Sequence, residues 1–79
     1  NKNANDLDNG NFIFINNNEM IINNIEGRAS LQIFDVMGRY LCNYEVTGSA
    51  NISTEEFSSG VYIIRLMDNN GVKTQKVVL

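Results

Sequence analysis

The chain has 79 residues, is 43% hydrophobic and carries a formal net charge of −3 at pH 7, which fits one small globular domain and excludes a disordered chain. The negative charge, without a basic face, argues against nucleic-acid binding and against a polybasic membrane-surface role. No apolar run approaches the roughly 20 residues of a membrane-spanning helix, so direct membrane insertion is not expected.

The N-terminal residues 1–11 differ in composition from the rest of the chain. They are rich in Asn, Asp and Gly, and only Ala4 and Leu7 are apolar. Such a composition is typical of a linker or a frayed terminus. We therefore expect residues 1–11 to connect an upstream domain to one folded domain over residues 12–79. The absence of a signal peptide at Asn1 favours a piece excised from a longer protein.

Short runs of β-branched, aromatic and aliphatic residues follow, spaced about ten residues apart and separated by turns that contain Asn or Gly. Seven strands are expected, at residues 12–15, 19–23, 29–35, 40–46, 50–53, 59–67 and 73–79. Residues 54–57 resemble a single helical turn, too short to be a helix on its own, with Phe57 plugging the end of the core. The pattern predicts an all-β domain, either a β-sandwich or a small barrel.

The turn and strand over residues 36–46 carry the clearest local signals. Gly38 is expected to supply a positive φ in a tight turn, and Asp35 to cap the turn amides. Alternate residues of the following strand share one face: Tyr40, Cys42, Tyr44 and Val46. Because Leu41 also looks core-facing, a β-bulge is expected to shift the alternation within this strand.

The last two expected strands form a β-hairpin around a turn that ends in Asn70-Gly71. One face of the first arm carries Tyr62, Ile64 and Leu66, and the other face is also largely apolar. This pattern predicts a central strand that is covered on one side and partly covered on the other. The second arm is expected to belong to the fold rather than to form a loose tail.

No catalytic, cofactor or metal site is predicted. The chain has no histidine that could activate its single cysteine, so Cys42 is best explained as a half-buried strand residue. Asp6 and Asp8 lack the downstream bidentate acid of a calcium loop. Glu55 and Glu56 are adjacent, so their side chains diverge, and they are expected to be a solvated surface rather than an acid/base pair.

The basic residues near the end of the chain allow two interpretations. Lys73 and Lys76, together with Arg65, could be solubilising charges that discourage pairing of an edge strand with another sheet. The alternative is a small recognition patch at the end of the chain, which composition alone does not favour over the first interpretation. Tyr62 is most simply explained as a core aromatic with its hydroxyl at the rim.

Three segments in fixed order carry a resemblance to a known family. Residues 31–39 have the pattern apolar-x-apolar-x-Asp-x-x-Gly-Arg, residues 57–62 have apolar-x-x-Gly-apolar-Tyr, and residues 74–79 have Thr-x-Lys followed by three apolar residues. In this order they resemble the type A C-terminal sorting domain of type IX secretion cargo in Bacteroidetes. The resemblance covers residues 12–79, although the proline-containing segment that often opens these domains is missing.

This resemblance implies an immunoglobulin-like β-sandwich that acts as a signal rather than as an enzyme and needs no cofactor. It implies a cargo domain on the N-terminal side, transit through the periplasm, and export by an outer-membrane translocon. A sortase-like peptidase would then remove the domain at the cell surface, with the cargo anchored there or secreted. Cleavage is expected before Phe12, because a peptidase needs unpaired backbone.

The resemblance also implies which residues serve the signal. The sorting-signal residues are Gly60, Tyr62, Lys73, Thr74, Lys76, Val77, Val78 and Leu79. The turn motif is Asp35, Gly38 and Arg39. Several of these have structural uses as well, the glycines for backbone geometry and the buried side chains for packing.

A second hypothesis is a non-catalytic immunoglobulin-like binding or spacer module of a secreted protein, such as an adhesin or carbohydrate-binding domain. A glycan site would need exposed aromatic side chains on a flat face. The candidates are Phe34, Tyr40 and Tyr44.

Overall fold

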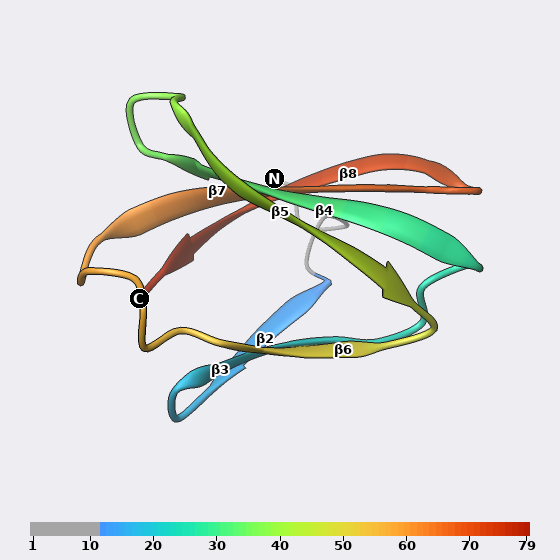
Figure 1. The fold of residues 1–79 in the computed structure, drawn as a ribbon, viewed down its shortest axis with the longest axis horizontal. Helices are drawn as coiled ribbons and strands as arrows, with labels where there is room; N and C mark the ends of the chain where they lie inside the picture. The colour runs from blue at the N-terminus through green and yellow to red at the C-terminus, as the bar shows by residue number, and fades with distance from the viewer. Residues whose placement is uncertain (1–11) are drawn as a thin grey trace, which may run out of the picture.

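The computed structural model describes residues 12–79, and these fold into seven antiparallel strands arranged as two facing sheets (Figure 1). The strands are β2 (Ile13–Asn16), β3 (Glu19–Ile22), β4 (Arg28–Asp35), β5 (Tyr40–Thr47), β6 (Ala50–Ser53), β7 (Val61–Asp68) and β8 (Gly71–Val78). One sheet has the order β2-β3-β6 and the other β5-β4-β7-β8. The predicted all-β sandwich is confirmed, and each strand lies within two residues of its expected bounds. The expected linker, residues 1–11, lies outside the described residues.

The core is formed by inward-facing side chains from both sheets. Five of them are fully buried: Met20, Ile22, Leu31, Ile33 and Ile64. On β7 the alternation predicted from the sequence is confirmed, since Tyr62, Ile64 and Leu66 are all buried. Within residues 12–79 there is no helix with the length and hydropathy to cross a membrane.

The turn between β4 and β5 is built as the sequence predicts. Gly38 has a φ of 87°, and Asp35 Oδ1 accepts hydrogen bonds of 2.9 Å from the backbone amides of Met37 and Arg39. Ile33 pairs with Cys42 and Phe34 pairs with Tyr40, so Leu41 is the extra residue of a bulge. The expected bulge is confirmed, but the expectation that Leu41 faces the core is wrong, because it is 44% exposed. A bulged residue has no partner across the strand pair and is free to turn outward.

One side of the sandwich, where β8 faces β2, is closed by a single side chain. Gln75 Oε1 accepts hydrogen bonds from the amides of Phe12 (2.7 Å) and Ile13 (3.0 Å), and its Nε2 donates to the carbonyl of Ile13 (3.3 Å). The amide group therefore acts as a short piece of backbone between the edges of the two sheets. We call this the sealed side.

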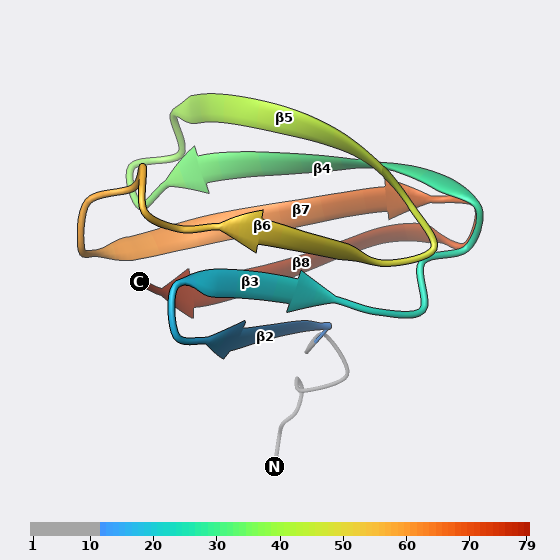
Figure 2. The same cartoon turned by 60° about the horizontal axis from the view of Figure 1, so that its bottom comes forward.

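The opposite side lies between β5 and β6, which belong to different sheets. Thr47 to Ser49 form a tight corner in which the amide of Ser49 donates to the carbonyl of Thr47 at 2.7 Å. From this corner the two strands diverge, as Figure 2 shows. We call the space between them the wedge. Phe57 is half-buried at its far end, and its amide donates to the carbonyl of Thr54 at 3.1 Å, so the expected single turn forms.

Candidate recognition surface

The three sequence motifs meet at one end of the four-stranded sheet. In the strand register Asp35 lies opposite Tyr62, and Tyr62 lies opposite Val77. With about 4.8 Å between neighbouring strands, the backbones of the first and last of these residues are roughly 10 Å apart. Residues more than 40 positions apart in the chain thus form one row, which we call the motif end of the sheet.

Four of the predicted sorting-signal residues are structural at this end. Tyr62 is 8% exposed, its hydroxyl donates to the carbonyl of Ser58 at 2.7 Å, and its ring meets that of Phe57 edge-on at 5.5 Å. Val77 is 4% exposed and packs in the core. Gly60 and Leu79 exchange two backbone hydrogen bonds of 3.0 and 2.8 Å, which extend the β7–β8 ladder by one pair. Gly60 also has a φ of 154°, which side-chain-bearing residues rarely adopt.

The other predicted sorting-signal residues lie on the surface of β8. Lys73, Thr74, Lys76 and Val78 are all exposed. Strand β8 is an edge strand, and hydrogen bonds in an antiparallel pair join alternate residues. Because Leu79 bonds to Gly60, the odd-numbered residues of β8 bond to β7. The backbone groups of Thr74, Lys76 and Val78 therefore point away from the sheet, ready to pair with an added strand.

The outer face of the sheet is apolar beside this edge. The register places Phe34 next to Ile63, and Ile63 next to Lys76. Tyr40 packs edge-on against Phe34 with ring centroids 6.0 Å apart, and Val61 lies opposite Val78. Tyr40 is 56% exposed and Val78 is 69% exposed. We call these five apolar residues the outer-face patch: Phe34, Tyr40, Val61, Ile63 and Val78.

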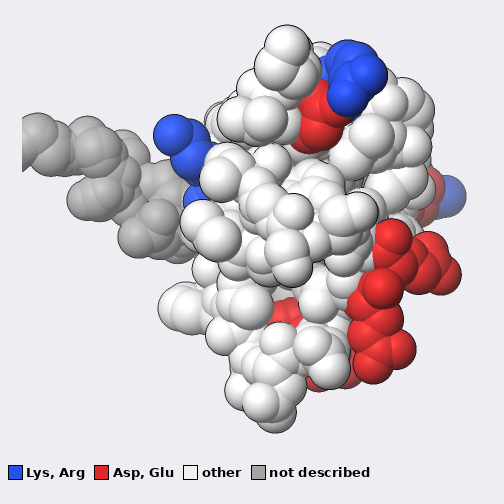
Figure 3. Space-filling view, turned by 90° about the vertical axis from the view of Figure 1, so that its left-hand side faces the viewer, with Lys and Arg blue, Asp and Glu red and all other residues white. Residues whose placement is uncertain are grey.

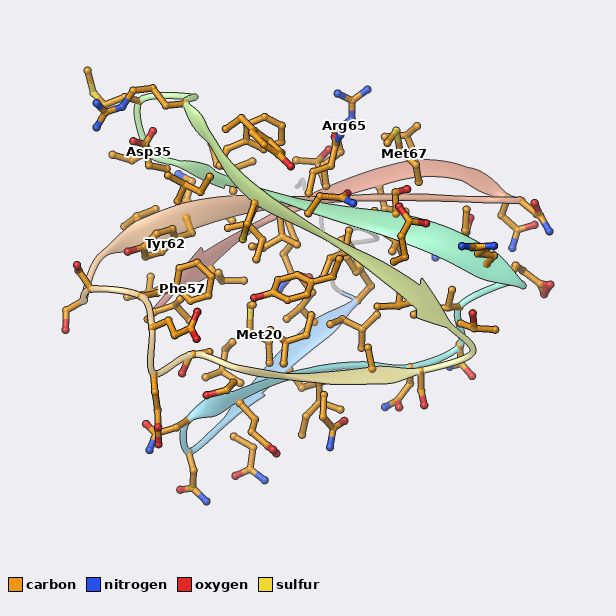
Figure 4. All side chains as sticks on the ribbon, in the orientation of Figure 1. Met20, Asp35, Phe57, Tyr62, Arg65 and Met67 are labelled. Carbon is orange, nitrogen blue, oxygen red and sulfur yellow. The ribbon has the colours of Figure 1, made fainter. Side chains whose placement is uncertain are left out.

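Basic side chains accompany the patch. Arg65 and Met67 point away from the three-stranded sheet, on the same outer face (Figure 4). In the turn motif, Arg39 Nε lies 2.7 Å from Asp35 Oδ2, and the Arg39 side chain is 77% exposed. The hydrogen bond from the Arg39 amide is the largest cause of a lowered pKa for Asp35, and the Arg39 side chain lowers this pKa further. The carboxylate thus stays ionised and fixes the turn at the motif end.

Sequence reasoning did not identify the outer-face patch. The signal was present, because the second face of the strand over residues 59–67 is nearly as apolar as the first. The structure shows that this second face has no covering layer among the described residues. A large apolar surface on a small domain often marks an interaction site.

The aromatic residues considered for a glycan site do not share one face. Phe34 and Tyr40 lie together on the outer face, but Tyr44 pairs with Leu31 and packs against the core. Residues 12–79 also contain no group of three acidic or thiol side chains placed to hold a metal ion.

A family model described as a secretion system C-terminal sorting domain matches residues 5–79. Comparison with curated proteins and with solved structures finds no match. Family members are the C-terminal signal of type IX secretion, which directs an attached cargo protein across the outer membrane to the cell surface or the medium. Since the match spans nearly the whole sequence and the three motifs meet in one structural site, this chain belongs to the family of secretion-system C-terminal sorting domains.

Proposed function

We propose that an outer-membrane translocon component recognises this sorting domain by adding a strand to the free edge of β8. The observation that carries the proposal is the convergence of three motifs at the end of the sheet where the outer edge of β8 has no partner strand among residues 12–79. The outer-face patch, with Tyr40 and Val78 exposed, lies beside this edge. Main-chain hydrogen bonds to Thr74 and Lys76 would supply affinity, as in other cases of strand addition.

Selectivity would come from the side chains around this edge. Lys73 and Lys76 supply positive charge, and Val78 joins the outer-face patch to the edge. Arg39 supplies a further exposed cation at the same end of the sheet. The buried members of the motif set, Tyr62 and Val77, hold the edge in position and do not contact the partner.

We propose the following order of events for this domain. The domain crosses the periplasm attached to its cargo, passes the translocon, and is removed at the cell surface by a sortase-like peptidase. We propose that cleavage occurs within residues 1–11, upstream of the backbone that Gln75 holds at Phe12 and Ile13. Paired backbone resists a peptidase because the chain must be extended and free to enter its active site.

Substituting Thr74→Pro tests the strand-addition step. Proline removes the amide that faces the free edge but keeps every hydrogen bond between β7 and β8, and proline is tolerated on edge strands for this reason. In a fusion of a periplasmic reporter to residues 1–79, expressed in a host with type IX secretion, export of the variant should fall at least tenfold. Thr74→Ala, which keeps the amide, should be exported normally.

Normal export of the Thr74→Pro fusion would overturn strand addition at β8. Thermal unfolding of the purified variants must show that both keep the wild-type fold. A second variant, Lys73→Glu with Lys76→Glu, tests the side-chain contribution without altering the backbone. Its export should also fall, and export equal to wild type would show that the lysines only protect the edge from pairing.

A further inference from the structure

The wedge is a second feature of the surface, on the side of the sandwich away from β8. Two adjoining hollows of about 520 and 390 Å³ lie along it and share Tyr44 and Glu56 in their walls. The first hollow begins at the corner formed by Thr47 and Ser49, and the second ends at Leu41 and Phe57. Together they follow the full length of the gap between β5 and β6.

The walls of the wedge are largely apolar. Five half-buried side chains pack against the core from this side: Cys42, Tyr44, Val46, Ala50 and Phe57. Burial is the largest cause of a raised pKa for Tyr44, so its phenol is neutral and presents mostly apolar surface. On the sealed side, the equivalent position is closed by Gln75 and the first strand.

Strand β5 offers unpaired backbone along this gap. The amide of Asp35 donates to Arg39 on the β5 side of β4, so alternate residues of β4 bond to β5. The register then pairs Cys42, Tyr44 and Val46 with β4. The backbone groups of Asn43 and Glu45 point away from the sheet, toward any strand added at this edge.

The charge along the wedge is acidic. Glu56 lines both hollows and Glu45 lines the first, whereas no Lys or Arg among residues 12–79 lines either one. Glu45 already accepts from Ser30 at 2.8 Å and lies 3.7 Å from Arg28, but Glu56 forms no ion pair within the described residues. Figure 3 shows Asp and Glu side chains gathered along one side of the face in view, and a further acidic group against basic side chains at its top.

We propose that the wedge binds an extended segment of another protein in which aliphatic residues alternate with Lys or Arg, by adding it as a strand to β5. The side chains of an added strand alternate between the two faces. Those opposite Cys42, Tyr44 and Val46 would enter the apolar wedge. Those opposite Asn43 and Glu45 would face outward, where a Lys or Arg next to the carboxylate is favoured and an acid is repelled. This site is separate from the β8 edge and does not depend on the proposed function.

Protection of Cys42 from alkylation provides the test. This thiol is the only one in the chain and lines the wedge, so an added strand should cover it. The probes are a synthetic eight-residue peptide of alternating valine and lysine and a matched peptide of alternating valine and glutamate. A saturating concentration of the lysine peptide should slow iodoacetamide labelling of the domain at least fivefold, and the glutamate peptide should have no effect.

Substitutions locate the binding within the wedge. Glu45→Gln, at the outward position where the lysines would lie, should weaken binding of the lysine peptide threefold to tenfold, and Asn43→Pro, which removes an unpaired edge amide, should abolish it. Glu26→Gln, an exposed acid outside both hollows, is the matched control and should bind normally. Thr74→Pro should also bind normally, because it alters only the β8 edge.

Three outcomes would overturn the proposal. They are equal protection by both peptides, no protection by either, and protection that Glu45→Gln and Asn43→Pro leave unchanged. The remaining possible occupant of the wedge is a second copy of this chain. Sedimentation of the free domain tests for it. If the chain dimerises and Cys42 is protected without peptide, a second copy fills the wedge and the proposed ligand is wrong.

Discussion

The two sides of this sandwich, where the edges of the two sheets meet, are closed to different extents. Each side brings together an edge strand from each sheet, with no main-chain ladder between the sheets. On the sealed side the Gln75 amide replaces that ladder with three hydrogen bonds to β2 and the residue before it. On the other side β5 and β6 share only the corner at Thr47 and Ser49, and the wedge stays open.

This difference shows that stability and accessibility are distributed unevenly in a small domain. A chain of about 80 residues buries only about 60% of the surface exposed when unfolded, so each buried polar contact matters to its stability. The sealed side carries the buried contacts. The side chains that line the wedge are half-buried, so removing them lowers the stability of the fold less. The wedge is therefore available for contacts with other molecules.

The largest expected effect is a lower free energy of unfolding when the hydrogen bonds of Gln75 on the sealed side are removed. Gln75→Ala removes the acceptor of the Phe12 and Ile13 amides, and both residues are less than 10% exposed. Unsatisfied buried donors cost about 1–3 kcal/mol each, so the free energy of unfolding should fall by about 2–3 kcal/mol. Urea denaturation of the purified domain measures this change.

Thr74→Ala is the matched control, because its side chain is exposed on the other face of the same strand. Its stability should stay within about 0.5 kcal/mol of wild type. Hydrogen exchange of the Ile13 amide should also accelerate in Gln75→Ala. An unchanged urea midpoint would show that water replaces the side chain and that the side is not sealed by Gln75.

A matched pair of valines compares the two sides directly. Val77 on β8 is 4% exposed, whereas Val46 on β5 is half-buried beside the wedge. Substitution by threonine keeps the shape and adds a hydroxyl that must be hydrated or bonded. Val77→Thr should cost about 1–2 kcal/mol and Val46→Thr about 0.5 kcal/mol or less. In a domain of this size the two melting temperatures should differ by about 4–8 °C.

Equal costs for the two valines would contradict the distinction between the sides. A larger cost for Val46→Thr than for Val77→Thr would show that the wedge is closed in solution. Circular dichroism at constant pH is sufficient for this comparison, since neither substitution changes the charge.

The smallest expected effect is a loss of folding stability at acid pH. Among residues 12–79, three carboxyl groups have a lowered pKa: Asp35 chiefly through the Arg39 amide, Glu45 chiefly through the Ser30 hydroxyl, and Asp68 chiefly through the Asn70 amide. A folded-state pKa below the unfolded value stabilises the fold at neutral pH. That contribution is lost as the pH falls below about 4 and these groups become protonated.

Urea midpoints measured between pH 6 and pH 2 should therefore decline toward acid. Asp35→Asn removes one of the three groups, so its urea midpoint should decline less steeply toward acid than that of wild type. Asn51→Asp, at an exposed strand position, is the control. A decline of equal slope in Asp35→Asn would show that protonation of Asp35 does not contribute to the loss of stability in acid.

Much of the fold was predictable because the signals were local. Period-two alternation located the strands, Gly38 and Asp35 located the β4–β5 turn, and the conflict at Leu41 located the bulge. The direction of Leu41 was not predictable, because the bulge could lie on either side of it. Its exposure depends on the pairing of Ile33 with Cys42, which is a contact between strands.

The candidate site was only partly predictable. The motifs identified Lys73, Thr74 and Lys76, and strand alternation predicted that Tyr62 is buried. Neither shows that Lys76 lies beside Ile63, with Phe34 on the next strand. No pattern in the sequence indicated the wedge between β5 and β6. Glu56 looked like ordinary solvated surface, and its position beside Tyr44 depends on the corner between the two sheets.

The sequence by itself determined which residues share a face of each strand, where the chain turns, and to which family it belongs. Only the tertiary structure decided which strands are neighbours, and with that the row from Asp35 to Val77, the seal at Gln75 and the wedge. The physical reason is that alternation is fixed by the backbone of a single strand. The partners of Gln75, by contrast, lie 62 and 63 positions away and are selected by packing of the whole core.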